Sequence, residues 1–116
     1  MDEAISAAVL AQVQYRHCSM QDRASFINGI RDVFLQEDVL CALSRMAVEE
    51  TGMGRVEDKI KKNTLALYKT PGTEDLRAEA FTGDDGLTLL ELSPFGVIGA
   101  ITPATNPSET VICNSI

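Results

Sequence analysis

The stretch Glu91–Glu109, ELSPFGVIGAITPATNPSE, determines how the rest of this chain is interpreted. Its uncharged, β-branched run ends at Pro103, and a short polar turn follows before Pro107, a residue typical of a first helical position. Strand, turn and helix N-terminus in this order are how α/β proteins build ligand sites at the carboxyl ends of their strands. The sequence therefore predicts a strand over Val97–Thr102, a helix from Pro107, and any chemistry between them.

The predicted strand is apolar at successive positions, VIGAI, so both of its faces should be buried. That pattern is typical of a central strand in a covered, mostly parallel sheet. The chain offers at most one neighbour, a strand predicted over Leu87–Leu92, and the closing helix from Ser108 to Ile116 has no stop signal. We therefore expect an α/β fold whose domain is incomplete, the front part of a larger protein.

Amphipathic helices are predicted before this stretch. Ser19 with Asp22 forms a weak variant of the capping box, and Gly52 is placed to end a helix in the left-handed conformation. The predicted helices run from Asp2, as cap, to about Tyr15, from Ser19 to near Gln36, from Asp38 to Gly52, and over residues 55–68.

The fourth predicted helix, RVEDKIKKNTLALY, carries a charge run that indicates a solvated face. Glu57 with Lys61, and Asp58 with Lys62, lie four residues apart in the favourable order for side-chain pairs. Residues 69–86 are predicted to be mostly loop, and GDDG at 83–86 is a strong turn signal.

Charge and composition exclude several function classes. The length of 116 residues predicts a single domain, and the apolar content of 45% is typical of a globular protein. A net charge of −7 argues against nucleic acid and anionic membranes, and no apolar run approaches the ~18 residues of a membrane span. Cys18, Cys41, Cys113 and the single His17 do not have the spacing of a metal site. We expect a soluble, cytoplasmic protein with reduced cysteines and no metal.

Asn106 has two interpretations from the residues alone. It occupies an N-cap position, with Pro107 first in the helix and Glu109 completing a capping-box pattern, and Glu109 itself complements the helix dipole. Alternatively its amide NH₂ points into a cleft and donates to a developing oxyanion. One side chain is able to serve both roles, with its oxygen on the helix N–H groups and its nitrogen toward the substrate.

Three segments resemble a known family. TGMGRVEDK (51–59), TPG (70–72) and TGDDGLTLLELSPFGVIGAITPATNPSETVICNSI (82–116) are similar to the N-terminal part of the CoA-acylating aldehyde dehydrogenases of the ethanolamine- and propanediol-utilisation type. The resemblance implies leading helices and a loop of a cofactor-binding domain over 1–85. It also implies a strand of the bridging, oligomerising β-hairpin over 86–94, and the first, truncated βα unit of a Rossmann-like domain over 95–116.

The resemblance also implies a reaction and its partners. Family members convert an aldehyde, CoA and NAD into acyl-CoA and NADH, reversibly, through a cysteine thiohemiacetal and thioester. None of the cysteines of this chain matches that nucleophile, so the chain by itself is expected to be inactive. The implied partners are a small aldehyde, further copies in a homo-oligomer, and shell or cargo proteins of a bacterial microcompartment, whose lumen is an alternative location to the cytoplasm.

Site residues follow from the resemblance by position. Asn106 matches the asparagine whose amide helps to hold the oxyanion. Thr102, Pro103, Ala104 and Thr105 match the turn that lies along the nicotinamide half of NAD. The turn is one residue longer than the usual superfamily turn, and it has Thr105 where that turn has an aromatic residue, as in the acylating branch.

Two alternatives remain from the sequence alone. In the first, the chain is a small helical scaffold or interaction protein that self-assembles through its apolar strand. In the second, it is a decayed or truncated reading frame that does not fold stably. A glycine-rich βα unit and a reactive cysteine beyond Ile116 would decide for the enzyme.

Overall fold

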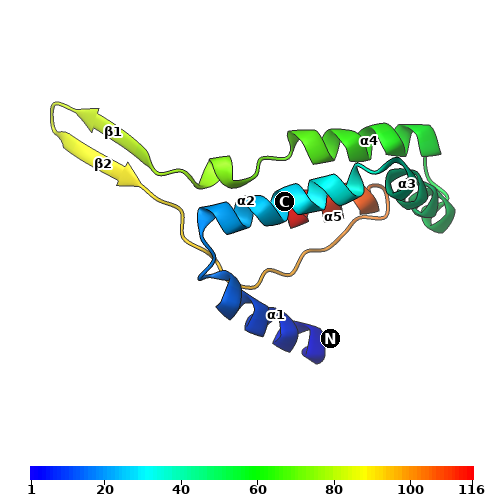
Figure 1. The fold of residues 1–116 in the computed structure, drawn as a ribbon, viewed down its shortest axis with the longest axis horizontal. Helices are drawn as coiled ribbons and strands as arrows, with labels where there is room; N and C mark the ends of the chain where they lie inside the picture. Colours follow the sequence, from blue (N-terminus) through cyan, green and yellow to red (C-terminus); the bar gives the residue numbers. More distant parts are fainter.

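The computed structural model describes residues 1–116, and Figure 1 shows a group of helices with a β-hairpin extending from it. The hairpin projects to one side, α1 lies apart at the bottom of the view, and α2, α3, α4 and α5 form the packed body. The elements are α1 (Asp2–Tyr15), α2 (Met20–Phe34), α3 (Glu37–Thr51), α4 (Val56–Lys69), a 3₁₀ turn (Thr73–Leu76), β1 (Glu79–Gly83), β2 (Gly86–Leu90) and α5 (Pro107–Ser115).

All of the predicted helices form, and two of the predicted signals are confirmed at their ends. Ser19 caps α2 in a complete capping box: its hydroxyl accepts the Asp22 amide at 3.1 Å, and its own amide donates to Asp22 Oδ2 at 2.9 Å. Gly52 ends α3 at φ 64°. The prediction that Asp2 caps α1 is wrong, because Met1 is the cap residue and no side chain caps this helix.

The capping box leads to a pH-dependent prediction. Hydrogen bonds from the Ser19 hydroxyl and amide lower the pKa of the Asp22 carboxyl below its ordinary 3.8. Because the folded-state pKa is the lower one, the stabilisation is fully present above about pH 3.8 and is lost as pH falls through the folded-state pKa. We expect Asp22→Ala to lower the melting temperature at neutral pH and to match the wild type in strong acid. Thermal unfolding of both proteins across that range is the measurement, and a pH-independent difference would contradict it.

The core lies where α3, α4 and α5 meet. Leu40, Leu67 and Ile112 are its buried residues, at 8%, 0% and 2% exposure. Leu65, only two residues before the fully buried Leu67 on α4, lies on another side of the helix and is 59% exposed. Removing apolar side chains from water is the main favourable term in folding, so this small cluster holds α5 to the other helices.

The segment predicted as mostly loop contains a strand. β1 pairs antiparallel with β2 from Glu79 opposite Leu90 to Gly83 opposite Gly86, so the GDDG signal is the hairpin turn. Sequence pattern missed β1 because EAFTG is short and only partly β-branched. β2 confirms most of the predicted strand over Leu87–Leu92 and ends at Leu90. Every residue of both strands is exposed.

The predicted strand over Val97–Thr102 does not form. The chain from Glu91 to Thr102 is irregular, and it passes back from the hairpin to α5 as an extended connection (Figure 1). Ile98 and Ile101, which were expected to be buried, are 72% and 95% exposed. A strand needs neighbours to accept its backbone hydrogen bonds, and the only sheet of this chain is the two-stranded hairpin.

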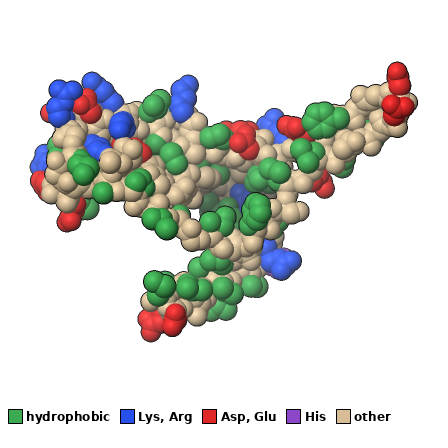
Figure 2. Space-filling view, turned by 180° about the vertical axis from the view of Figure 1, so that it is seen from behind, with side chains coloured by type: hydrophobic (Ala, Val, Ile, Leu, Met, Phe, Trp, Pro, Cys, Tyr) green, Lys and Arg blue, Asp and Glu red, His purple; other side chains and the backbone are tan.

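Large exposed apolar side chains lie on α1 and on the β-hairpin, the two parts that project from the packed helices. Figure 2 shows them over α1 and along the hairpin arm, while acidic residues cluster at the tips of both. On α1 the exposed positions Ile5, Val9 and Val13 form one stripe, each about half exposed. Contiguous exposed apolar surface of this kind marks interaction surfaces. No helix has both the length and the apolarity that crossing a membrane requires.

Candidate functional site

The turn predicted to carry the chemistry lies directly before α5 and next to α4. Thr102 to Thr105 are exposed, Asn106 is the N-cap residue of α5, and Pro107 occupies the first turn of that helix as predicted. α5 packs against α4 and α3, and the Ile112 side chain is buried between them. The core therefore fixes where the turn stands relative to α4.

A buried lysine on α4 holds the backbone of the turn. Lys59 is 4% exposed, and its Nζ donates to the Thr105 carbonyl oxygen at 2.6 Å. The same ammonium lies 3.6 Å from Glu109 Oε1, and both side chains are largely removed from water. Burying a charge is costly unless it is paired and hydrogen-bonded, so Lys59 and Glu109 compensate one another. Ser108 adds a hydrogen bond from its hydroxyl to Glu109 Oε2 at 3.1 Å.

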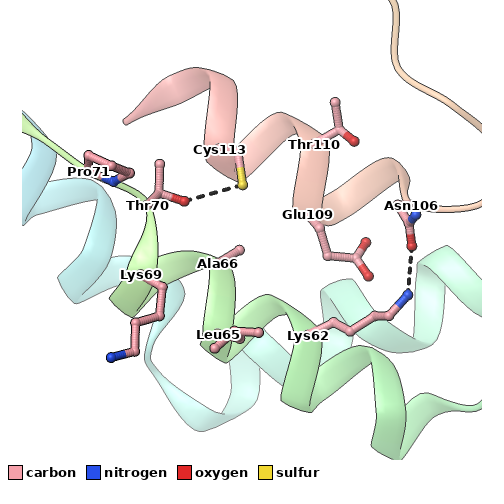
Figure 3. Close-up of a pocket in the computed structure, with 10 residues that line it drawn as sticks. All are labelled: Lys62, Leu65, Ala66, Lys69, Thr70, Pro71, Asn106, Glu109, Thr110 and Cys113. Carbon is pink, nitrogen blue, oxygen red and sulfur yellow. Dashed lines mark hydrogen bonds between the residues drawn. The ribbon is translucent and has the colours of Figure 1, made fainter.

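A second lysine of α4 holds the side chain of Asn106. Lys62 Nζ donates to Asn106 Oδ1 at 2.8 Å, as Figure 3 shows. The prediction that the Asn106 side chain caps the helix with Glu109 as a capping box is therefore wrong, since Asn106 makes no side-chain cap hydrogen bond. Its oxygen is bound to the ammonium instead, which is a stronger, charge-assisted partner than a backbone amide. Asn106 Nδ2 donates to no group of the chain.

Asn106 lies at one end of an open groove of about 720 Å³ between α4 and α5. In Figure 3 the Glu109 carboxylate and the Asn106 amide lie on the α5 side of this groove, opposite Lys62. At the other end the Thr70 hydroxyl donates to Cys113 Sγ at 3.2 Å. The groove is lined by Lys62, Leu65, Ala66, Lys69, Thr70, Pro71, Asn106, Glu109, Thr110 and Cys113.

The four residues expected to contact the cofactor remain open to a ligand. Thr102, Pro103, Ala104 and Thr105 are exposed, and neither threonine hydroxyl makes a hydrogen bond within the chain. Thr102 lines an apolar groove beside Pro107, whereas Thr105 lines a separate, mostly polar one next to Lys59. The turn therefore leaves two side-chain hydroxyl groups and its backbone accessible to solvent.

The charged pairs predicted along α4 are wrong in detail. Neither Glu57 with Lys61 nor Asp58 with Lys62 forms an ion pair. Arg55 bonds Asp58 at 2.7 Å instead, and this hydrogen bond is the main reason that the pKa of the Asp58 carboxyl is lowered. That pairing leaves Lys62 free to bind Asn106 Oδ1.

The turn was predicted from the sequence, but the two lysines that contact it, Lys59 and Lys62, were not. Lys59, Asn63 and Leu67 lie four residues apart on α4, and all three are buried. Asn63 donates through Nδ2 to Ser44 Oγ on α3 at 3.0 Å. The four-residue spacing from Lys59 to the core residue Leu67 was the signal in the sequence that could have placed Lys59 on the buried side of α4. It was overlooked because the charge run of this helix was assigned to a solvated face. No group of three or more His, Cys, Asp or Glu side chains is placed to hold a metal ion.

The chain was compared with known proteins along its whole length. No family model matches the chain. It is 48% identical over 116 residues to the propanal dehydrogenase (CoA-propanoylating) of Citrobacter freundii, covering 100% of this chain and 25% of the relative. It is 46% identical over the same length to the acetaldehyde dehydrogenase (acetylating) of Escherichia coli strain K12, covering 24% of that protein. The chain therefore spans about a quarter of the length of these relatives.

Solved structures match it as closely. The propionaldehyde dehydrogenase of Rhodopseudomonas palustris, with bound CoA and an acylated cysteine, superposes at a TM-score of 0.90 with 66% identity, over 97% of this chain and 26% of that one. An engineered glycolyl-CoA reductase with bound NADP⁺ gives the same score and identity. A propionaldehyde dehydrogenase from a fucose-utilisation microcompartment of Clostridium phytofermentans gives 0.87 and 55%.

The helices and the hairpin thus match the N-terminal part of aldehyde dehydrogenases of the CoA-acylating class. Over its whole length the chain is homologous to the N-terminal quarter of these enzymes, with propanal and acetaldehyde dehydrogenases among its relatives. The resemblance inferred from the sequence is confirmed.

Proposed function

We propose that this chain supplies the N-terminal quarter of an enzyme that converts a small aldehyde, CoA and a nicotinamide cofactor into acyl-CoA and the reduced cofactor. The observation that carries the proposal is the match, at a TM-score of 0.90 and 66% identity, to an enzyme whose structure holds CoA and an acylated cysteine. The cofactor, when bound, accepts a hydride. NAD is the cofactor that the sequence implies, and an NADP⁺-bound neighbour makes NADP the alternative.

The residues of this chain have binding and polarising roles in that reaction. Thr102, Pro103, Ala104 and Thr105 form the surface along which the nicotinamide half of the cofactor lies. Asn106 Nδ2, which has no partner within the chain, donates to the aldehyde oxygen as negative charge develops on it. Lys59 keeps the turn at its place on α4 through the Thr105 carbonyl, 2.6 Å from its ammonium.

The whole protein is proposed to be a homo-oligomer in the cytoplasm or in the lumen of a bacterial microcompartment. Exposed leucines and Phe81 on the hairpin support the oligomer, because such surface is usually covered by another chain. The microcompartment source of the Clostridium phytofermentans neighbour supports that location and shell or cargo proteins as partners.

A chimeric enzyme tests the proposed function. This chain replaces the matching N-terminal segment of the Rhodopseudomonas palustris enzyme, and the chimera is assayed with propionaldehyde, CoA and NAD or NADP. We expect acyl-CoA and reduced cofactor to form together. The two separate pieces are the controls, and each is expected to be inactive. A folded chimera that binds CoA but forms no thioester would contradict the proposal.

A further inference from the structure

The amide of Asn106 is held in one orientation by a residue outside the turn. Lys62 Nζ lies 2.8 Å from Oδ1, and an ammonium can only donate, so it selects the oxygen end of the amide. We propose that Lys62 is a positioning residue of the reaction: it binds Asn106 Oδ1 and thereby turns Nδ2 toward the aldehyde oxygen. This inference deepens the proposed function and rests on it.

The geometry explains why a lysine is needed at this place. The terminal torsion of an asparagine side chain is broad and roughly two-fold, so packing alone does not distinguish its oxygen from its nitrogen. Asn106 is half-buried at one end of the groove, and its side chain makes no cap hydrogen bond that would fix the amide. A flipped amide would present its oxygen to the developing oxyanion, and the two partial negative charges would repel.

Lys62 is suited to this role by its position. It lies on α4, which the core cluster of Leu40, Leu67 and Ile112 packs against α5. Figure 3 shows its side chain extending across the mouth of the groove to Asn106, whereas Lys69, on the same helix and lining the same groove, points away. Lys59 has the separate task of holding the backbone of the turn. Lys69 is therefore a matched control for a charge on this helix.

The test uses the chimeric enzyme with Lys62→Met, Lys69→Met, Asn106→Ala and the double variant Lys62→Met/Asn106→Ala. We expect Lys62→Met to lower kcat by roughly 10-fold or more, but less than the ~10²–10³ that loss of the donor itself costs, with KM for cofactor unchanged. Lys69→Met should have the parent kcat. Because Lys62 acts through Asn106, the double variant should be no slower than Asn106→Ala alone. Lys62→Arg, which retains a cationic donor, should recover most of the rate.

The outcomes separate this inference from the proposed function. If Asn106→Ala is slow and Lys62→Met is as fast as the parent, or if the two losses multiply, the positioning role is overturned while the proposed function stands. A second measurement uses the 116-residue chain itself. The side-chain amide NMR signals of Asn106 should shift in Lys62→Met and not in Lys69→Met, and unchanged signals in both would overturn the inference independently of any enzyme assay.

Discussion

Asn106→Ala is expected to lower kcat by ~10²–10³ in the chimeric enzyme, with little change in KM for the cofactor. The physical reason is that Nδ2 is an unpaired donor, and its contribution grows only as charge develops on the aldehyde oxygen. A group that binds the transition state better than the ground state changes kcat and not cofactor affinity. Steady-state kinetics with propionaldehyde, at saturating CoA, is the measurement.

Asn106→Asp is the control that separates catalysis from stability. Aspartate has nearly the same size and shape as asparagine, and it keeps an oxygen that accepts from Lys62. We therefore expect Asn106→Asp to melt close to the parent and still to lose the rate, because it has no donor for the oxyanion. Normal kcat in either variant, together with a lowered melting temperature, would show that Asn106 contributes only to stability, through its contact with Lys62.

The helices could be predicted from sequence because their signals are local. The capping box of Ser19 with Asp22 and the left-handed Gly52 satisfy backbone groups within one turn, so no distant residue is needed to form them. The segment Val97–Thr102 could not be predicted in the same way. Its apolar pattern describes a buried strand, but a strand depends on distant partners, and the single hairpin does not pair with it.

The position of the turn before α5 was predictable for the same reason. A polar segment between Pro103 and Pro107, with Pro107 in the first turn of the helix, is a local signal. The contacts that hold it link residues 46 and 44 positions apart, Lys59 with Thr105 and Lys62 with Asn106. In the sequence these two lysines look like the solvated lysines of the same charge run. Their contacts form only when α5 packs against α4.

Lys59→Met is expected to cost about 3–5 kcal/mol of the free energy of unfolding, because removing one partner of a buried ion pair leaves the other charge uncompensated. Glu109 Oε1 is buried and has no hydrogen-bond partner, so its nearest compensation is the ammonium at 3.6 Å. The Thr105 carbonyl also loses its donor. Small domains have only about 5–15 kcal/mol in total, so the variant should be close to unfolding. Urea unfolding of the 116-residue chain, followed by circular dichroism, measures the loss.

Two further variants show whether the loss comes from the pair. Lys61→Met changes an exposed lysine of the same helix and should stay within about 0.5 kcal/mol of the parent. Lys59→Met/Glu109→Leu removes both charges, and replacing a buried pair by apolar groups is often neutral, so it should recover much of the stability lost in Lys59→Met. If the double variant is as unstable as the single one, the Thr105 carbonyl and the shape of the lysine stem account for the effect, and Glu109 does not. A loss below about 1 kcal/mol in Lys59→Met would mean that water reaches the pair and screens it as it does a surface ion pair.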